Sequence, residues 1–191
     1  EIYTLSLHDA LPIFGAMGGM IAQEIVRMDS DLVNSLILAG TGPRGGFELD
    51  KVTGKTFKYM FKAALERIDP KRYIFYNHDE QGKVEALKVL DRMGARTEQF
   101  KDKDMKISGF LTQLKAIKAW GQAPQDDLKY ITQPTLIVNG DKDMQVPTEN
   151  SYAMHEKVEG SKLLIYPNAG HGSIFQYADE FSKELLRFLA A

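Results

Sequence analysis

Cysteine is absent from the 191 residues, and the chain has no long hydrophobic run. The lack of cysteine excludes disulfide bonds, thiolate catalysis and cysteine-ligated zinc. No segment approaches the ~18 consecutive apolar residues that a membrane-spanning helix needs, so no membrane span is expected. The net charge is −2 at pH 7, which favours neither nucleic acid nor an anionic membrane as a partner. We therefore expect a cytoplasmic protein with one sizeable core.

A glycine-rich turn near the start lacks the one residue that would make it catalytic. The segment from Phe14 to Gly19 reads F-G-A-M-G-G and leads into a helical pattern. A strand-to-helix turn of the form G-x-S-x-G-G presents a serine nucleophile beside a helix N-terminus. Here Ala16 occupies the serine position and Phe14 the first glycine, and a methyl group cannot attack a carbonyl. A phosphate-binding loop is an alternative, although the turn lacks both a P-loop lysine and the G-x-G-x-x-G spacing.

The first thirteen residues resemble the in-frame translation of a widely used short-read sequencing adapter. They read E-I-Y-T-L-S-L-H-D-A-L-P-I, and the resemblance has no gap. We therefore treat residues 1–13 as non-native and expect the native N-terminus to be missing. The alternative is a genuine apolar strand that carries a pair formed by His8 and Asp9. On the adapter interpretation these two are not catalytic candidates, and Ala16 lies close to a junction.

Short apolar segments then alternate with helical patterns. Residues 33–39, 134–139 and 162–166 read as buried strands, and each is followed by glycine or proline. Residues 178–189 read as a final amphipathic helix. The helix after the glycine turn has apolar residues at helical spacing: Met17, Ile21, Ala22, Ile25 and Met28. This alternation predicts a parallel sheet of about three to four strands that is covered by helices on both faces.

A long helical insertion separates the first two predicted strands. Its first helix has apolar residues at i, i+3, i+4, i+7, i+8 and i+11: Phe57, Met60, Phe61, Ala64, Leu65 and Ile68. Two further helices are expected over 84–93, ending at Gly94, and over 107–120, ending at Gly121. Helical spacing favours packing of these apolar side chains over the lining of a pocket. An insertion of this size favours a lid, with a helical subdomain of no functional role as the alternative.

Three loops are expected to meet beyond the carboxyl ends of the strands, where open parallel sheets place reactive groups. The first is the glycine turn. The second follows the strand over 134–139 and contains Asp141 and Asp143. The third follows the strand over 162–166 and contains His171. Their chain order is nucleophile position, acid, histidine, which is the order of an α/β-hydrolase triad.

Four motifs in this order carry a resemblance to the α/β-hydrolase family, of the esterase, lipase and haloperoxidase-like kind. They are M-G-G-M-I-A-Q-E, G-T-G-P-R-G-G, P-T-L-I-V-N-G-D-K-D-x-x-V-P and N-A-G-H-G-S. The resemblance covers the C-terminal two thirds of the fold. It implies a truncated α/β core over 14–43 and 131–191, with residues 44–130 as the helical lid. It also implies a small-molecule acyl substrate and neither metal nor cofactor.

Position by position, the resemblance makes Asp143 the triad acid and His171 the base. It places Ala16 at the missing nucleophile and gives the backbone N–H of Met17 to the oxyanion hole. Alternatives stay open at this point. His171 is alternatively a half-buried histidine bonded to a loop carbonyl, and Asp143 alternatively a turn or cap residue, with Asp141 as the acid. A metal site formed by the two aspartates is a weaker alternative because no further ligands stand nearby.

Three hypotheses about function follow. The first is a fragment of a serine hydrolase that acts on a small ester-like substrate, inactive as written because Ala16 replaces the serine. The second is a hydrolase fold that binds a small molecule without catalysis. The third uses Asp143 and His171 as a dyad for proton abstraction without a cofactor.

Overall fold

The computed structural model describes residues 14–95 and 106–190, with no side-chain description for 14–16, so the adapter-like segment lies outside the described residues. The strands are β1 (Leu36–Ala39), β2 (Thr135–Gly140) and β3 (Lys162–Tyr166). The helices and 3₁₀ turns are α1 (Phe14–Met28), η1 (Ser30–Leu32), η2 (Leu49–Lys51), α2 (Val52–Glu66), α3 (Lys71–Ile74), α4 (Glu80–Gly94), α5 (Ile107–Gln122), α6 (Glu149–Lys157), α7 (Ser173–Gln176) and α8 (Ala178–Leu189).

The three described strands form one parallel sheet in the order β1-β2-β3. Leu38 pairs with Ile137, and Ile137 pairs with Leu163 in the next strand. All six residues of β2 are buried, as expected of a central strand that is covered on both faces. The sequence-based prediction of a parallel sheet with flanking helices is confirmed.

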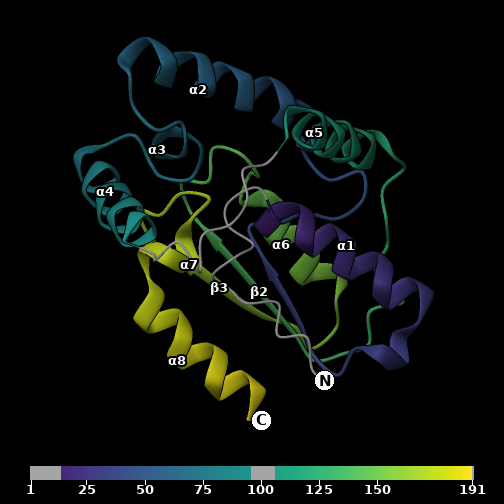
Figure 1. Ribbon diagram of the computed structural model, residues 1–191. Helices are drawn as coiled ribbons and strands as arrows, with labels where there is room; N and C mark the ends of the chain where they lie inside the picture. Colours follow the sequence, from purple (N-terminus) through teal and green to yellow (C-terminus); the bar gives the residue numbers. More distant parts are fainter. Residues whose placement is uncertain (1–13, 96–105, 191) are drawn as a thin grey trace.

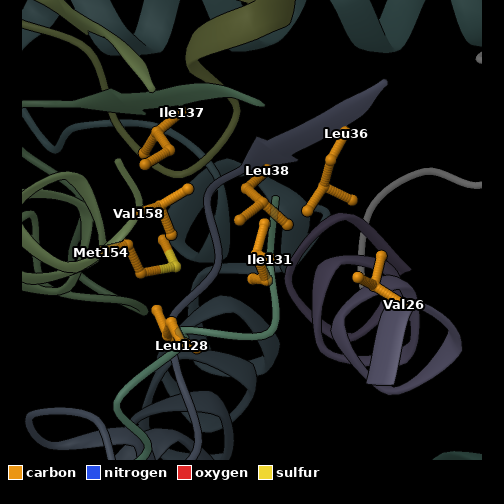
Figure 2. Close-up of a cluster of buried hydrophobic side chains, with 8 residues drawn as sticks. All are labelled: Val26, Leu36, Leu38, Leu128, Ile131, Ile137, Met154 and Val158. Atoms are coloured by element: carbon orange, nitrogen blue, oxygen red, sulfur yellow. The ribbon is translucent and has the colours of Figure 1, made fainter. Parts of the chain in front are cut away.

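Helices cover both faces of this sheet, so the described fold has three layers (Figure 1). On one face, Leu36 and Leu38 of β1 pack with Val26 of α1 and Met154 of α6 (Figure 2). The members of this cluster are Val26, Leu36, Leu38, Leu128, Ile131, Ile137, Met154 and Val158. On the other face, Leu136, Val138 and Tyr166 pack with Phe181 and Phe188 of α8. The alternation follows from the two-residue period of a strand.

Helices α2, α3, α4 and α5 lie within the predicted insertion, and local features explain the end of α2, the start of α4 and the glycine near the end of α5. Asp79 caps α4, since its carboxylate accepts the N–H of Gly82 at 2.8 Å. Helix α2 ends at Glu66, since the next residue, Arg67, has a φ of 56° and shortly precedes Pro70. Gly121 was expected to stop α5, but the helix continues to Gln122. A Cβ at Gly121 would lie 2.3 Å from the backbone nitrogen of Asp50, so glycine here permits close packing against η2.

The helix α2 is present as predicted, but the prediction of which of its residues pack in the core is wrong. Phe61 and Leu65 are 68% and 70% exposed. The buried residues of α2 are instead Val52, Thr56, Tyr59 and Ala63. Ile21, Ile25 and Met28 of α1 are likewise exposed. Helical periodicity identifies a helix, but where apolar residues lie on two sides it does not say which side meets the core.

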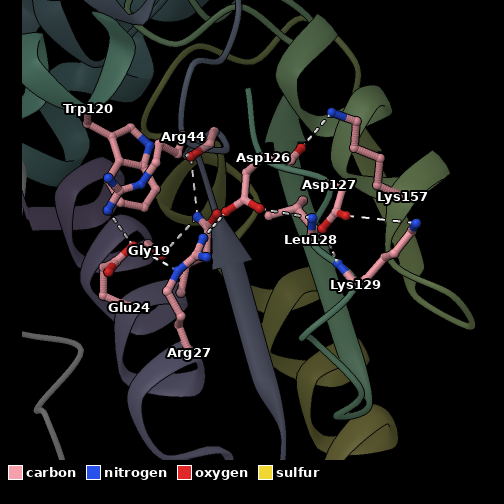
Figure 3. A network of polar contacts seen from close by, with 12 residues as sticks. Gly19, Glu24, Arg27, Arg44, Trp120, Asp126, Asp127, Leu128, Lys129 and Lys157 are labelled. Atoms are coloured by element: carbon pink, nitrogen blue, oxygen red, sulfur yellow. Dashed lines mark hydrogen bonds and ion pairs between the residues drawn. The ribbon is translucent and has the colours of Figure 1, made fainter. Parts of the chain in front are cut away.

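A polar network fixes the insertion to α1 (Figure 3). Arg44 donates to Glu24 at 2.7 Å, and its guanidinium lies 4.8 Å from the centre of the Trp120 ring. Arg27 pairs with Asp126. The indole N–H of Trp120 donates to the carbonyl of Gly42 at 3.1 Å, in the loop that follows β1. These contacts hold the end of α5 against the carboxyl end of the sheet.

Candidate functional site

Asp143 and His171 meet at the carboxyl end of the sheet. Asp143 lies in the loop after β2, and His171 lies in the loop after β3. The Nδ1 atom of His171 lies 2.7 Å from Oδ2 of Asp143, and the two side chains are 6% and 0% exposed. The pairing that the chain order predicted is therefore present as a short, buried contact. The catalytic roles of the two residues stay predictions.

The Asp143 carboxylate is oriented by its own loop. Its Oδ1 atom accepts the backbone N–H groups of Gln145 at 2.8 Å and Val146 at 2.9 Å. The loop is closed from both sides, because the Thr148 hydroxyl donates to the carbonyl of Gly140 and the Asn139 amide donates to that of Val146. With Oδ1 satisfied by two donors, Oδ2 is left to face the imidazole.

The His171 ring is confined between Gly40 and Phe75. Gly40 has a φ of 56°, and a Cβ placed there would lie 3.2 Å from both Cε1 and Nδ1 of the ring. The Phe75 ring lies on the imidazole with the centroids 5.5 Å apart. Because a carboxylate only accepts hydrogen bonds, Nδ1 carries a proton, and in the neutral imidazole Nε2 then keeps its lone pair. Among the described residues, none hydrogen-bonds Nε2.

Backbone contacts hold the histidine loop to the insertion. The N–H of Gly172 donates to the carbonyl of Phe75 at 2.6 Å, and the N–H of Gly170 donates to the Gln176 side chain at 2.8 Å. Gly170 lies so close to the segment around Phe75 that a Cβ would meet its carbonyl oxygen at 2.7 Å. Sequence reasoning missed Phe75 and Gly40. The G-T-G motif after β1 was the available signal for Gly40, whereas no pattern marked Phe75.

Asp141, the alternative acid, makes no described hydrogen bond to the imidazole. Its side chain is exposed, and its backbone N–H donates to the carbonyl of Tyr166 at 3.0 Å. Among the described residues, Asp143 alone hydrogen-bonds His171. The other two described histidines bond locally, His78 to the carbonyl of Tyr73 at 2.9 Å and His155 to the Ser161 hydroxyl at 2.8 Å.

The nucleophile position lies in helix rather than in a turn that precedes a helix. Helix α1 begins at Phe14, so Ala16 is in its first turn and the predicted separate glycine turn is not present in the described residues. The strand expected before it would fall in residues 1–13, outside the described part of the chain. Met17 packs partly buried against the cluster that contains Met20 and Val146. Val146 is also a backbone donor to Asp143.

Two glycines follow Ala16, and they differ in their surroundings. A Cβ at Gly19 would meet the side chain of Thr41 at 2.5 Å, whereas Gly18 has nothing within 4 Å. Gly19 therefore permits the close approach of α1 to the loop after β1. This loop also contains Gly40, where an added Cβ would lie 3.2 Å from the His171 ring. The start of α1 and the imidazole thus border the same short loop.

Two buried tyrosines near the site stay protonated at neutral pH. Burial raises the pKa of Tyr76 well above its ordinary value, and burial raises the pKa of Tyr166 to about 12. Neither phenol is a base at neutral pH.

In the described part of the chain, no three His, Asp or Glu side chains lie together as a metal site. No described helix has the length and apolar character needed to span a bilayer.

Residues 15–177 match the model of the family described as the alpha/beta hydrolase fold. The matched range covers most of the chain, which therefore belongs to the α/β-hydrolase family, as the four motifs predicted.

Relatives of known sequence or structure cover nearly the whole chain. The non-heme haloperoxidase of Rhodococcus erythropolis is 28% identical over 178 residues, which are 90% of this chain and 64% of that protein. The 2-hydroxy-6-oxo-6-(2'-aminophenyl)hexa-2,4-dienoic acid hydrolase of Metapseudomonas resinovorans is 22% identical, over 92% of this chain and 58% of that protein. An α/β hydrolase fold protein from Chitinophaga pinensis superposes with a TM-score of 0.81 at 27% identity, over 90% of this chain and 61% of that one. The chain spans about three fifths of the length of each.

Proposed function

We propose that this chain carries the acid and the base of a serine hydrolase that acts on a small ester-like or related acyl substrate. The observation that best supports the proposal is the 2.7 Å contact between His171 and Asp143, with Nε2 of the imidazole left without a partner among the described residues. Relatives named as a haloperoxidase and as an oxo-acid hydrolase agree with small-molecule chemistry.

The proposed mechanism divides the work between the two loops. Asp143 holds the imidazole in the Nδ1–H tautomer and stabilises the imidazolium that forms during the reaction. Nε2 of His171 then takes the proton from a hydroxyl at position 16, which becomes the nucleophile. The backbone N–H of Met17, near the start of α1, would donate to the oxyanion.

Ala16 leaves the first step of this mechanism without an atom to perform it. Loss of a nucleophilic serine costs a hydrolase about 10⁶ in kcat, so no acyl transfer is expected from the chain as it stands. We propose that the parent reading frame encodes serine at position 16 and glycine at position 14. Sequencing the genomic locus across codons 1–20 tests this directly, and an alanine codon at position 16 would contradict it.

Introduction of a hydroxyl tests the acid–base pair in the protein itself. We expect Ala16→Ser to be labelled covalently by a fluorophosphonate probe, whereas the unmodified chain is not labelled at this position. The further change His171→Ala should abolish the labelling, because the serine loses its base. His155→Ala in the same background is the matched control and should leave the labelling unchanged. Labelling that survives His171→Ala would refute the assigned base.

The pair of Asp143 and His171 is intact although Ala16 supplies no hydroxyl. This observation favours a second candidate function, which is proton abstraction from a carbon acid without a cofactor. The unmodified chain would then show a pH–rate profile that follows one histidine-like pKa. His171→Ala would abolish this activity. A third candidate, binding without catalysis, predicts stabilisation by a small ligand with no turnover. The pH–rate profile of the unmodified chain and its stabilisation by a ligand without turnover separate these two candidates from the serine hydrolase.

A further inference from the structure

Helix α2 is apolar on two opposite sides. Its inner side packs Tyr59 and Ala63 into the core. The outer side carries a second apolar row at i, i+4 and i+8, formed by Phe57, Phe61 and Leu65, which are 45–70% exposed. Ile68, just beyond the end of the helix, is 39% exposed. Figure 1 shows α2 running along the outside of the molecule. The hydrophobic core buries the inner apolar side of α2 and leaves the outer apolar side exposed.

The exposed apolar surface continues onto α5. Phe57 of α2 meets Phe110 of α5 edge to face, with the ring centroids 6.3 Å apart. On either side of Phe110 in the sequence, Ile107 and Leu111 of α5 are 78% and 48% exposed. We call this surface the α2–α5 face, and it consists of Phe57, Phe61, Leu65, Ile68, Phe110, Ile107 and Leu111. Exposed apolar residues that are contiguous rather than single mark interaction sites.

The charges on these two helices are almost all positive, although the whole chain carries −2. Helix α2 has three lysines and one glutamate, and α5 has two lysines and no acidic residue. The glutamate, Glu66, hydrogen-bonds the Tyr73 hydroxyl. Lys58 and Lys62 directly follow Phe57 and Phe61 in the sequence, so they line one flank of the apolar row. Lys62 also lies 4.1 Å above the Tyr73 ring.

We propose that the α2–α5 face docks onto an anionic lipid membrane. The phenyl and leucyl side chains enter the boundary between headgroups and acyl chains, and the lysines meet the lipid phosphates and carboxylates. A second copy of the chain fits this face less well, because two such faces would bring like charges together. The proposal does not depend on the proposed catalytic function, since no residue of the dyad takes part.

Vesicle flotation tests the proposal, because bound protein rises with lipid while aggregated protein sinks. We expect the chain to float with phosphatidylcholine vesicles that contain phosphatidylserine, and much less with phosphatidylcholine alone. The double variant Lys62→Gln/Leu65→Ser should lower the partition coefficient about tenfold, since one lysine near the surface contributes about fivefold and the lost apolar contact adds to it.

A matched control uses the same spacing of lysine and leucine on α8. Leu186 is 68% exposed, close to the 70% of Leu65, and Lys183 stands three residues before it. Lys183→Gln/Leu186→Ser should leave flotation unchanged. Equal loss in both variants, or no flotation of the unmodified chain, would overturn the proposal. Concentration-dependent dimerisation that only the α2 variant abolishes, without vesicle binding, would assign the face to a second copy instead.

Discussion

The Asp143 carboxylate is held by three donors, which are two backbone N–H groups and the His171 ring. This arrangement sets the imidazole tautomer before any substrate arrives. Each backbone donor comes from the loop that carries Asp143, so the acid needs no support from a distant element. The orientation of the carboxylate is therefore set within the loop after β2, whereas the pairing also needs His171 from the loop after β3. The family resemblance, rather than the residues of the loop alone, made Asp143 and not Asp141 the predicted acid.

Replacement of Asp143 by asparagine should change the tautomer of His171. The amide keeps one oxygen, which the N–H groups of Gln145 and Val146 would hold, so its NH₂ group would face Nδ1. Nδ1 must then accept, and the proton moves to Nε2. Nitrogen-15 NMR of the imidazole measures this directly in the unmodified chain and in Asp143→Asn. An Nδ1–H signal that persists in the variant would contradict the assigned contact.

A side chain at position 40 should destabilise the fold. The positive φ of Gly40 alone costs a non-glycine residue about 1–2 kcal/mol, and a Cβ would also press on the His171 ring at 3.2 Å. We expect Gly40→Ala to lower the free energy of unfolding by about that amount, as measured in urea. Gly54→Ala in α2 is the control, because nothing lies within 4 Å and alanine favours a helix by about 0.5–1 kcal/mol. Equal changes in the free energy of unfolding for Gly40→Ala and Gly54→Ala would contradict this prediction.

At the scale of elements, local patterns predicted the strands and the long helices well. β3 and α8 have the bounds that the sequence predicted, since each is a short apolar or amphipathic segment with clear limits. Helix α6 was not predicted as an element of defined bounds, because it buries polar Asn150 and Ser151 and has no apolar stripe. The inner face of α2 was missed for a related reason, since buried Thr56 bonds Gln145 across the fold. Such tertiary contacts leave no periodic signal.

The start of α4 should depend on pH through its cap. The N–H of Gly82 lowers the pKa of Asp79, so the ionised carboxylate stabilises the fold above the usual carboxyl pKa, and this contribution is lost as the pH falls through the lowered value. Asp79→Asn keeps the acceptor oxygen but removes the charge. We expect the unmodified chain to exceed this variant in stability at pH 7, and the difference to shrink below about pH 4. Urea unfolding across pH 2.5–7 measures it, and a constant difference would contradict the prediction.

At the scale of the whole molecule, two surfaces are apolar and lack a described partner. One is the α2–α5 face, and the other is the side of α1 that carries Ile21, Ile25 and Met28. Beside α1, β1 pairs with β2 alone among the described residues, so its other edge has no described partner. Unpaired strand edges with apolar neighbours promote association between chains. The net charge of −2 is too small to oppose it strongly.

We therefore expect the chain to aggregate as its concentration rises, and we assign the cause to the surface formed by α1 and the edge of β1. Met28 is 84% exposed, so Ile25→Lys/Met28→Lys removes no buried contact of Met28 and adds charge beside the edge of β1 that has no partner among the described residues. This variant should raise the monomer fraction in size-exclusion chromatography with light scattering. Leu186→Lys on α8 adds a charge at another exposed site, away from that edge, and should have little effect. If the unmodified chain stays a soluble monomer at high concentration and melts cooperatively above ~45 °C, the sheet that contains the three described strands is stable on its own and the prediction is wrong.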